Sequence, residues 1–303
     1  VQYREKAASH RLAWVGHVLG KRETRRLIGD YVLNQNDIAD QALFPDRVAY
    51  GAWGVDDHHP EGFFYNKWPP SSHPTHMFSK GVEFSIPLRS LYSKNVSNLL
   101  MAGRDISASH VALAATRVML TCAVIGQAAG TAGALCVKYD ASPRGIYHQH
   151  MAELQQQLLK DGAHVIDLPN SDPHDLARSA TVTGSSQRTR PGGELMAPGN
   201  VTNGYARAAA GGTNAWAPAP DEPVPQWVEL AWDRPHTCNV AHVTFLTKHH
   251  AARAFVLEAR CEDGWRALSE VSANRHRRHV LGFEPTSASR LRIVLLETSS
   301  PMA

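Results

Sequence analysis

The feature that most constrains how this chain folds is a run of twenty residues without charge, Val118–Val137. The run is rich in alanine and glycine, and Gly126, Gly130 and Gly133 lie roughly one helical turn apart. About 20 apolar residues is also the length of a membrane span, and Gly-x-x-x-Gly is a helix-pairing spacing. However, polar and glycine residues dilute the hydrophobicity of the run, and neither flank carries an aromatic belt. The sequence therefore favours a buried helix packed tightly on a sheet over a membrane span.

A short apolar segment, 99–102, precedes this run and breaks at Gly103, the pattern of a buried strand that ends in a tight turn. At the carboxyl end of a parallel strand, Gly103 would allow close approach of a ligand, and Asp105 could accept hydrogen bonds from hydroxyl groups. A helix that begins near Met119 would direct unpaired N–H groups at an anionic ligand, with the charge of Arg117 beside them. The residues alone favour the simpler interpretation, in which Asp105 caps the turn and Arg117 is a surface residue.

Together these residues resemble the C-terminal, FAD-contacting segment of a family of bacterial FAD-dependent oxidoreductases. The resemblance is carried by Ala-Gly-Arg-Asp-Ile-Ser, a histidine a few residues later, Arg-Val-Met-x-Thr-Cys-x-x-x-Gly-Gln-Ala-Ala-Gly, and an earlier Arg-Glu-x-Arg-Arg-x-x-Gly run. It extends over roughly residues 20–162. Many flavoproteins have Ala-Gly-Asp at this turn, whereas Arg104 intervenes here. The resemblance implies FAD as cofactor, with contacts from Gly103, Arg104, Asp105, Ser107, Arg117, Met119 and Thr121.

The phosphate-binding motif of a flavoprotein is missing from the chain. A FAD-binding Rossmann fold starts with a strand and Gly-x-Gly-x-x-Gly, and that pattern occurs nowhere in the 303 residues. The chain also starts with Val1, and its first residues are too charged for a signal peptide. We therefore expect the C-terminal part of a FAD-binding Rossmann-type domain, whose missing N-terminal region is a partner from the same protein.

Residues 45–87 are rich in loops, aromatic side chains and histidines. Long irregular segments inside a compact domain tend to carry function. By the resemblance, the substrate side of the flavin pocket is built here, and Trp53 and His59 are the expected substrate contacts. Aromatic faces beside polar groups suit a sugar.

Oxidation of a hydroxyl-bearing carbon by a flavin needs a base that takes the hydroxyl proton, and histidine is the usual choice. The expected catalytic residues are His58 and His110. His58 and His59 lie beside Asp56 and Asp57, but adjacent residues without a distant third ligand do not predict a metal site. We therefore expect no metal.

The remainder of the chain changes pattern twice. A covering helix is expected from Pro143 to Lys160, where Asp161-Gly162 stops it, and a polar, proline-containing linker is expected over 166–179. From residue 180 to 303, short alternating apolar runs predict a β-sandwich, which resembles galactose-binding-like (discoidin-type) jelly rolls. The expected fold class is thus α/β plus all-β, with domains over 1–165 and 180–303. An amphipathic helix is also expected over residues 4–19, and a capped short helix over Asn36–Asp40.

Charge is nearly balanced, with 31 Lys and Arg against 28 Asp and Glu, so no nucleic-acid partner is indicated. The one basic cluster, residues 275–279, is expected in a solvated hairpin loop, with binding of an anionic ligand as the alternative. The four cysteines show no metal-binding spacing.

The sequence as a whole predicts a FAD-dependent oxidoreductase that oxidises a hydroxyl of a carbohydrate or polyol by hydride transfer to flavin. One alternative is a non-catalytic carbohydrate-binding protein whose first half is a degenerate flavoprotein scaffold. Another is a polysaccharide lyase or hydrolase that uses His58, Asp56 and Asp57. The two carboxylates are sequence neighbours, which places them on opposite faces of an extended segment and makes them poor partners for acid–base work.

Overall fold

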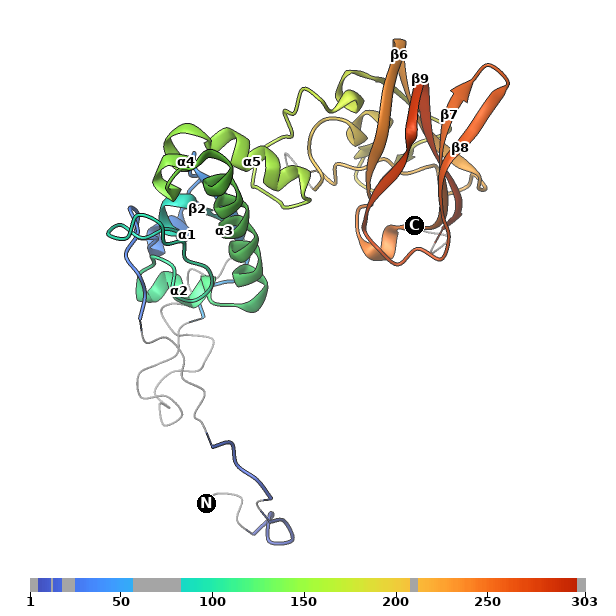
Figure 1. Ribbon diagram of the computed structural model, residues 1–303. Coiled ribbons are helices and arrows are strands. Elements are labelled where there is room, and N and C mark those ends of the chain that lie inside the picture. The colour runs from blue at the N-terminus through green and yellow to red at the C-terminus, as the bar shows by residue number, and fades with distance from the viewer. Residues whose placement is uncertain (1–4, 12, 18–24, 57–82, 208–211, 299–303) are drawn as a thin grey trace.

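The structure is a computed structural model that describes residues 5–11, 13–17, 25–56, 83–207 and 212–298. Helices dominate the first half of the chain and strands the second (Figure 1). The first half contains α1 (Gln35–Ala39), β1 (Arg47–Gly51), β2 (Phe84–Pro87), the 3-10 turn η4 (Leu88–Ser90), α2 (His110–Thr116), α3 (Met119–Tyr139), α4 (Pro143–Gln149) and α5 (Met151–Lys160).

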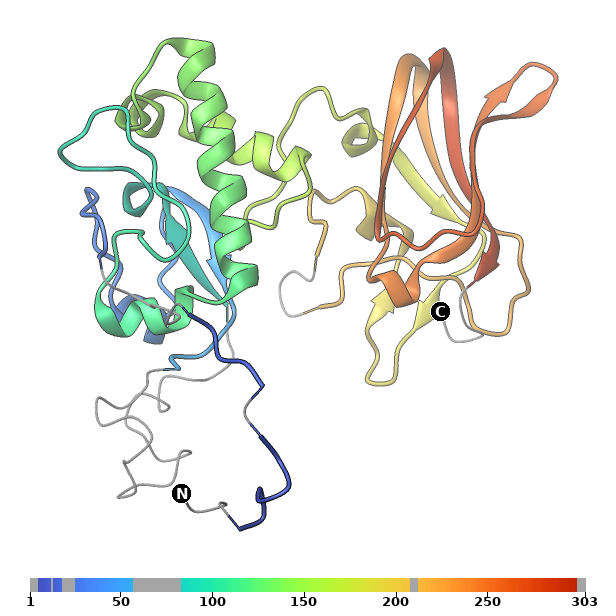
Figure 2. The ribbon, with the colours of Figure 1, turned by 60° about the horizontal axis from the view of Figure 1, so that its bottom comes forward.

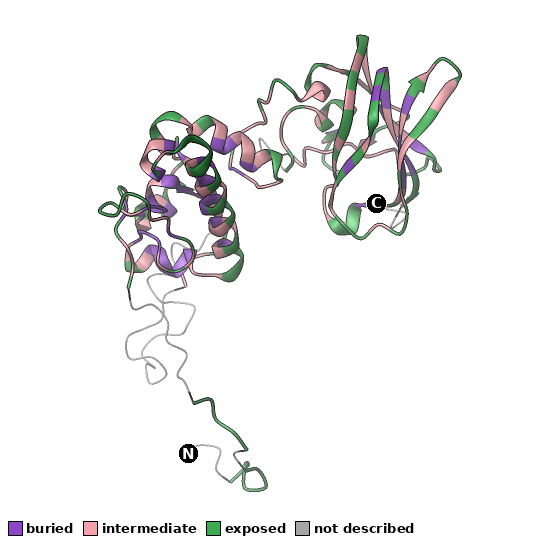
Figure 3. Ribbon diagram, in the orientation of Figure 1, coloured by how far each residue is buried: buried purple, intermediate pink, exposed green. Residues whose placement is uncertain are grey.

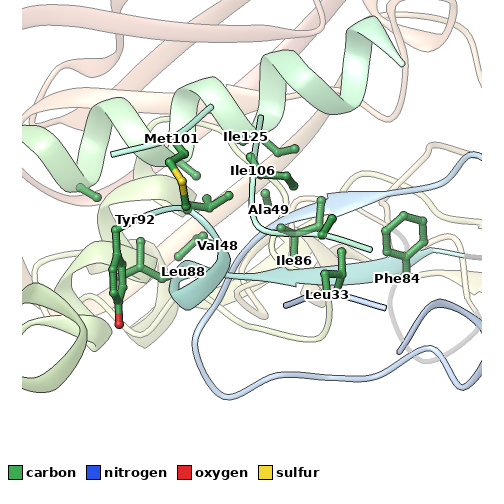
Figure 4. Packing of buried hydrophobic residues seen from close by; sticks show 14 of the residues in the cluster. Leu33, Val48, Ala49, Phe84, Ile86, Leu88, Tyr92, Met101, Ile106 and Ile125 are labelled. Atoms are coloured by element: carbon green, nitrogen blue, oxygen red, sulfur yellow. The ribbon is translucent and has the colours of Figure 1, made fainter. Parts of the chain in front are cut away.

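The core of the first half lies between α3 and the antiparallel β1–β2 pair. Ile125 of α3 faces Met101 and Ile106, while Val48 of β1 and Ile86 of β2 lie beneath them (Figure 4). All five side chains are almost completely buried. This packing holds α3 across the small sheet, so its two ends are positioned by β1 and by the helices α4 and α5.

The short helix α1 confirms its sequence prediction. Asn34 is the N-cap, and its side chain accepts a hydrogen bond from the Asn36 N–H at 2.9 Å. The carboxylate of Asp37 accepts in return from the Asn34 backbone N–H at 2.8 Å, which completes a capping box. Tyr31 also donates to Asp37 at 2.7 Å, and this fixes the extended segment before the helix.

Two predictions for this half are wrong. The described residues of the expected 4–19 helix form turns and irregular chain, and they are exposed. Without a core to receive its apolar face, such a short helix is marginal in water. The expected strand over 99–102 is reduced to an isolated antiparallel bridge between Leu100 and Tyr92. Its turn is confirmed, because Gly103 has φ of +101°.

Helix α3 begins at Met119 as predicted but is far less buried than expected. Thr121, Ile125, Ala128, Ala129, Ala132 and Leu135 form its buried face. The opposite face is exposed (Figure 3), and Met119, Leu120 and Val137 are each more than 80% exposed. By length and composition α3 is also the one described helix that could cross a membrane, which is weak evidence because core helices pass the same test.

The expected helix from Pro143 to Lys160 is two helices. His150 has φ of −131° and ψ of 21°, which ends α4 and begins α5. Its imidazole stacks on the Tyr139 ring at 3.8 Å between centroids, so a contact with the end of α3 accompanies the break. The predicted stop is confirmed, because Gly162 follows α5 with φ of +87°.

The second half is an antiparallel β-sandwich (Figure 2). Its sheet has the order β3 (Thr181–Gly184), β6 (Gln226–Thr244), β9 (Arg278–Thr298), β7 (Ala252–Cys261) and β8 (Gly264–Val271). The smaller elements are η5 (Leu176–Ser179), β4 (Arg188–Thr189), β5 (Leu195–Met196), η6 (Pro198–Val201) and η7 (Lys248–His250).

Two long strands allow one sheet to form both layers of the sandwich. The β6–β9 ladder is irregular between Ala231 and His236. Ile293 from one side of this irregularity and Leu281 from the other pack in the same core around Phe255, so the two parts of the ladder face each other. The sequence pattern predicts four separate strands here, 226–232, 239–247, 279–283 and 290–297. They form two strands because the ladder continues through the bend.

The predicted linker, 166–179, is hydrogen-bonded to both halves. Arg47 donates to the Ile166 carbonyl at 2.6 Å, and Gln156 donates to the Pro169 carbonyl at 3.2 Å. On the other side, Asn170 N–H donates to the Gly204 carbonyl at 2.8 Å. These bonds restrict how the first half is oriented against the sandwich.

Candidate functional site

The beginning of α3 is an electropositive point in the first half. Val118 is the N-cap and makes no side-chain capping bond, and the first intrahelical bond is donated by Cys122 to Val118. The N–H groups of the first turn are therefore available to a ligand, and the helix dipole adds partial positive charge. The preceding residue, Arg117, ends α2 and brings a full positive charge to this point.

Arg117 is tied to the segment that leaves β1. Its guanidinium donates to the Asp56 carbonyl at 2.8 Å and lies 3.3 Å from the Asp56 carboxylate. The Arg117 side chain is only 15% exposed, so this contact holds it in place. The same segment presents Trp53, which is 53% exposed. Arg117 and Trp53 are thus brought into one region by a contact across 61 residues of sequence.

The turn at Gly103 lies at the same end of α3. Burial raises the pKa of the Cys122 thiol, while the charge of Arg104 lowers it and that of Asp105 raises it, so all three side chains are near neighbours. Cys122 is in the first turn of α3. A Cβ at Gly103 would meet no other atom within 4 Å, so the turn borders open space.

Asp105 carries an unsatisfied polar atom. Its Oδ1 is buried and makes no hydrogen bond within the described part of the chain. Its backbone carbonyl accepts from Leu27 N–H at 2.9 Å, which anchors the residue. A buried acceptor without a donor costs about 1–3 kcal/mol, so such groups in native proteins usually have a ligand or water as partner.

The structure places the other predicted cofactor contacts in different environments. Met119 is exposed at the start of α3, whereas Thr121 is buried on its inner face. Ser107 is completely buried, and its Oγ makes no hydrogen bond to any described residue. His110 is exposed as the first residue of α2, after the N-cap Ser109. His58 and His59 lie outside the described residues.

Sequence reasoning missed two participants. The sequence patterns suggest for Asp56 only a catalytic carboxylate or a metal ligand, and for Cys122 only a thiol packed in the core helix, yet these residues connect the β1 segment and the Gly103 turn to the start of α3. Neither contact has a sequence signal, because a loop residue and a helix residue far apart in the chain carry no shared periodicity.

Neither a groove nor a metal-ion cluster in the described structure offers a comparable candidate for a functional site. An open groove of about 440 Å³ lies between α3 and α5, but two of its three charged residues, Lys138 and Glu153, bond to each other at 2.7 Å, and the third, Asp161, accepts from Gln157 at 3.0 Å. Among the residues the structure describes, no group of three or more His, Cys, Asp or Glu is arranged to hold a metal ion.

Comparison with solved structures finds carbohydrate-binding modules. A chitosan-binding module of a Paenibacillus sp. IK-5 chitosanase/glucanase is 18% identical, with a TM-score of 0.34, over 42% of this chain and 88% of that chain. A C. perfringens family 32 module in complex with galactose is 12% identical, with a TM-score of 0.34, over 41% of this chain and 88% of that chain. A search among curated proteins finds no match.

Comparison with family models finds a single description for the first half of the chain. The model of the FAD dependent oxidoreductase family matches residues 1–158, more than half of the 303 residues. The match includes α3, the Gly103 turn, Arg117 and the segment around Trp53. The chain therefore belongs to the FAD-dependent oxidoreductase family.

Proposed function

We propose that this chain supplies the flavin-edge and substrate-side residues of an oxidoreductase that oxidises a hydroxyl group of a carbohydrate or polyol. Flavin supplies the hydride acceptor for such a reaction. The chain's own residues bind and orient the cofactor and substrate and remove the hydroxyl proton. The single observation that carries the proposal is the convergence of an uncapped helix start, Arg117 and a buried Asp105 oxygen that has no partner among the described residues.

The residues present fit FAD in their chemistry. The N–H groups at the start of α3 and the Arg117 guanidinium suit the pyrimidine edge of a flavin, which becomes electron-rich on reduction. The orphaned Oδ1 of Asp105 is an acceptor suited to a ribityl hydroxyl. The open space beside Gly103 allows a ligand to approach the backbone closely. A contact from Ser107 requires a shift of the surrounding chain, since its side chain is fully buried.

Two histidines remain our candidates for the base. His110 is exposed at the start of α2 and lies in sequence between the Gly103 turn and Arg117. In its neutral form it would accept the hydroxyl proton at a ring nitrogen while the hydride leaves the same carbon. His58, with His59 as a substrate contact, is the second candidate. Trp53 offers an exposed aromatic face of the kind that stacks on a sugar ring.

We infer that the missing half of the cofactor site comes from a region that carries Gly-x-Gly-x-x-Gly, because these residues hold only the flavin end. The outward face of α3 is uncharged up to Val137, and a Cβ added at Gly126 or Gly130 would meet nothing within 4 Å. Glycine in a helix costs about 1 kcal/mol relative to alanine, so two open glycines suggest close approach of another chain segment.

The first test is the visible spectrum of this chain produced together with such a nucleotide-binding region. We expect flavin bands near ~450 nm, which reflect the bound cofactor. Replacement of Arg117 by alanine removes the charge beside the α3 start and should lower flavin content at least about tenfold, because a desolvated charge contact is worth roughly 1.5–3 kcal/mol. Arg178→Ala, at an exposed site in η5, is the matched control.

A second test uses the open face of α3. In this chain alone, Gly130→Leu should raise stability by roughly 0.5–1 kcal/mol, because leucine is a better helix former and meets open space. With the nucleotide-binding region present, the same substitution should reduce flavin content about tenfold or more, since the added side chain prevents close approach. Gly199→Leu, at another open glycine in η6, should leave flavin content unchanged.

These experiments also distinguish the alternative function. A folded, colourless protein that binds glycans with the nucleotide-binding region present would indicate a carbohydrate-binding protein on a degenerate flavoprotein scaffold. If the Gly130→Leu variant retained as much flavin as the unsubstituted protein, the proposed packing of the nucleotide-binding region on the open face of α3 would be wrong. The proposal that this chain binds flavin would not be affected. Flavin reduction by sugars in stopped-flow absorbance then identifies the substrate among hydroxyl compounds.

A further inference from the structure

One end of the sandwich is strongly basic. Three described segments meet there, 204–207, 245–250 and 272–278, and they contain no Asp or Glu. They carry five permanent positive charges, Arg207, Lys248, Arg275, Arg277 and Arg278, together with three histidines. The basic loop expected from the sequence, residues 275–279, is therefore only one of three segments that form a larger basic surface.

Arg277 joins the three segments. Its Nε donates to the Leu246 carbonyl at 3.1 Å, and its terminal nitrogen donates to the Ala206 carbonyl at 2.5 Å. The Arg277 carbonyl in turn accepts from Phe245 N–H at 2.8 Å. The loops are thus held together by backbone partners of an arginine, and carboxylates play no part in these bonds.

Within the described residues, no carboxylate pairs with the basic side chains of this region. Burial lowers the pKa of Arg277, and the charges of Arg207 and Arg278 lower it further. Burial, Arg278 and Lys160 lower the pKa of His242 on the same side, although Asp161 and Asp175 oppose this shift. Among the described residues, none of the five basic side chains forms an ion pair with a carboxylate.

Of the basic residues on this surface, only Arg277 and Arg278 form hydrogen bonds that hold described parts of the protein together. Arg278 donates to the Lys160 carbonyl at the end of α5 and to Nδ1 of His242 at 3.2 Å, and Arg277 is bonded as described. The side chains of Arg207, Lys248 and Arg275 are exposed and make no hydrogen bond or ion pair to a described residue. Their charges are free to meet an anion from solution.

The basic end also faces the first half of the chain. The Arg277 charge interacts with the Tyr50 hydroxyl of β1, and β1 leads directly into Trp53 and Asp56. Tyr50 itself packs edge-on against His164 at 5.0 Å. A polymer held on the basic end would therefore lie beside the strand that leads to the candidate site.

From this arrangement we propose that the end of the sandwich formed by Arg207, Lys248 and Arg275 binds a carbohydrate that bears carboxylate or sulfate groups. The assignment to carbohydrate rests on the proposed function; the assignment of negative charge rests on the surface alone. Neutral sugars use aromatic and hydroxyl contacts, whereas a cluster of unpaired cations favours an anionic chain and binds it in a salt-dependent way.

The test is titration of the full chain with polygalacturonate, and with the same polymer after reduction of its carboxyl groups. We expect binding to the anionic polymer that weakens at least about tenfold between 50 mM and 500 mM salt, since exposed charge contacts are screened over this range. Arg207→Glu with Arg275→Glu should weaken binding a further ten- to hundredfold at low salt, roughly tenfold per reversed charge.

Arg266→Glu is the matched control, because Arg266 is exposed on β8 at the opposite end of the sandwich. Equal binding of the reduced polymer, or no loss in the double variant, would overturn the proposal. Tighter binding of single-stranded DNA of equal charge would move the assignment to nucleic acid and would also overturn it. A sulfated polymer such as dextran sulfate separates sulfate from carboxylate recognition. Flavin content is measured on the same samples, so failure of the oxidoreductase proposal is detected separately.

Discussion

Replacement of Asp46 by alanine should destabilise the first half of the chain by about 3 kcal/mol, near the lower end of the range for breaking a buried ion pair. Asp46 is 2% exposed, and its carboxylate accepts from Arg89 Nε and a terminal nitrogen, each at 2.9 Å, and from the Arg89 backbone N–H at 3.1 Å. Without it, the guanidinium is left half-enclosed between the Tyr31 and Tyr147 rings.

The lower end of the range is expected because Arg89 remains 27% exposed and can recover some hydration. Thermal and urea unfolding followed by far-ultraviolet circular dichroism measure the loss. Asp40→Ala, at an exposed carboxylate in the same region, should change stability by less than about 0.5 kcal/mol. Equal stability of the two variants would show that the Asp46–Arg89 pair does not hold the β1 and η4 segments together.

Replacement of Phe255 by alanine should destabilise the sandwich by about 3–5 kcal/mol, the usual cost of removing a buried aromatic side chain. Phe255 is fully buried and packs edge-on against Phe245 and His279, with centroids at 5.3 Å in both cases. The cavity would open where the two layers of the sheet face each other. Phe255→Leu fills most of that volume and should cost clearly less.

The two variants together test the domain division, 1–165 and 180–303, which we propose as two cooperative units. In differential scanning calorimetry, Asp46→Ala should lower the transition of the first half and Phe255→Ala that of the sandwich. A single transition shifted by both variants would show that the hydrogen bonds of residues 166–179 join the halves into one unit.

Sequence patterns correctly predicted the elements whose start or end depends on neighbouring residues. The capped short helix near Asn36, the start of α3 and the stop at Gly162 after α5 all depend on a few adjacent residues, and each is found, although the cap of the short helix is Asn34. The 4–19 helix and the 99–102 strand failed for the opposite reason. Their patterns are real, but a helix or strand forms only when a neighbouring surface accepts it.

The candidate site divides in the same way. The turn at Gly103 and the helix start at Met119 were predicted from residue type and spacing, because both depend on adjacent residues, whereas Arg117 became a candidate through the family resemblance. The role of Asp56 could not be predicted, since it depends on a contact with Arg117 across 61 residues. The exposure of the outer face of α3 could not be predicted either, because the sequence of an uncharged helix is the same whether that face is buried or exposed.

By itself, then, the sequence determined the two structural classes and, through its resemblance to a known oxidoreductase family, the family and the candidate residues at the start of α3. The structural classes follow from composition and periodicity, and the family follows from its short motifs. The tertiary structure alone decided that an oxygen of Asp105 is buried without a partner in the described part of the chain, that one face of α3 is open, and that three separate loops form a single basic surface. Each of these is a relation between distant residues, and long-range packing sets such relations independently of any local pattern.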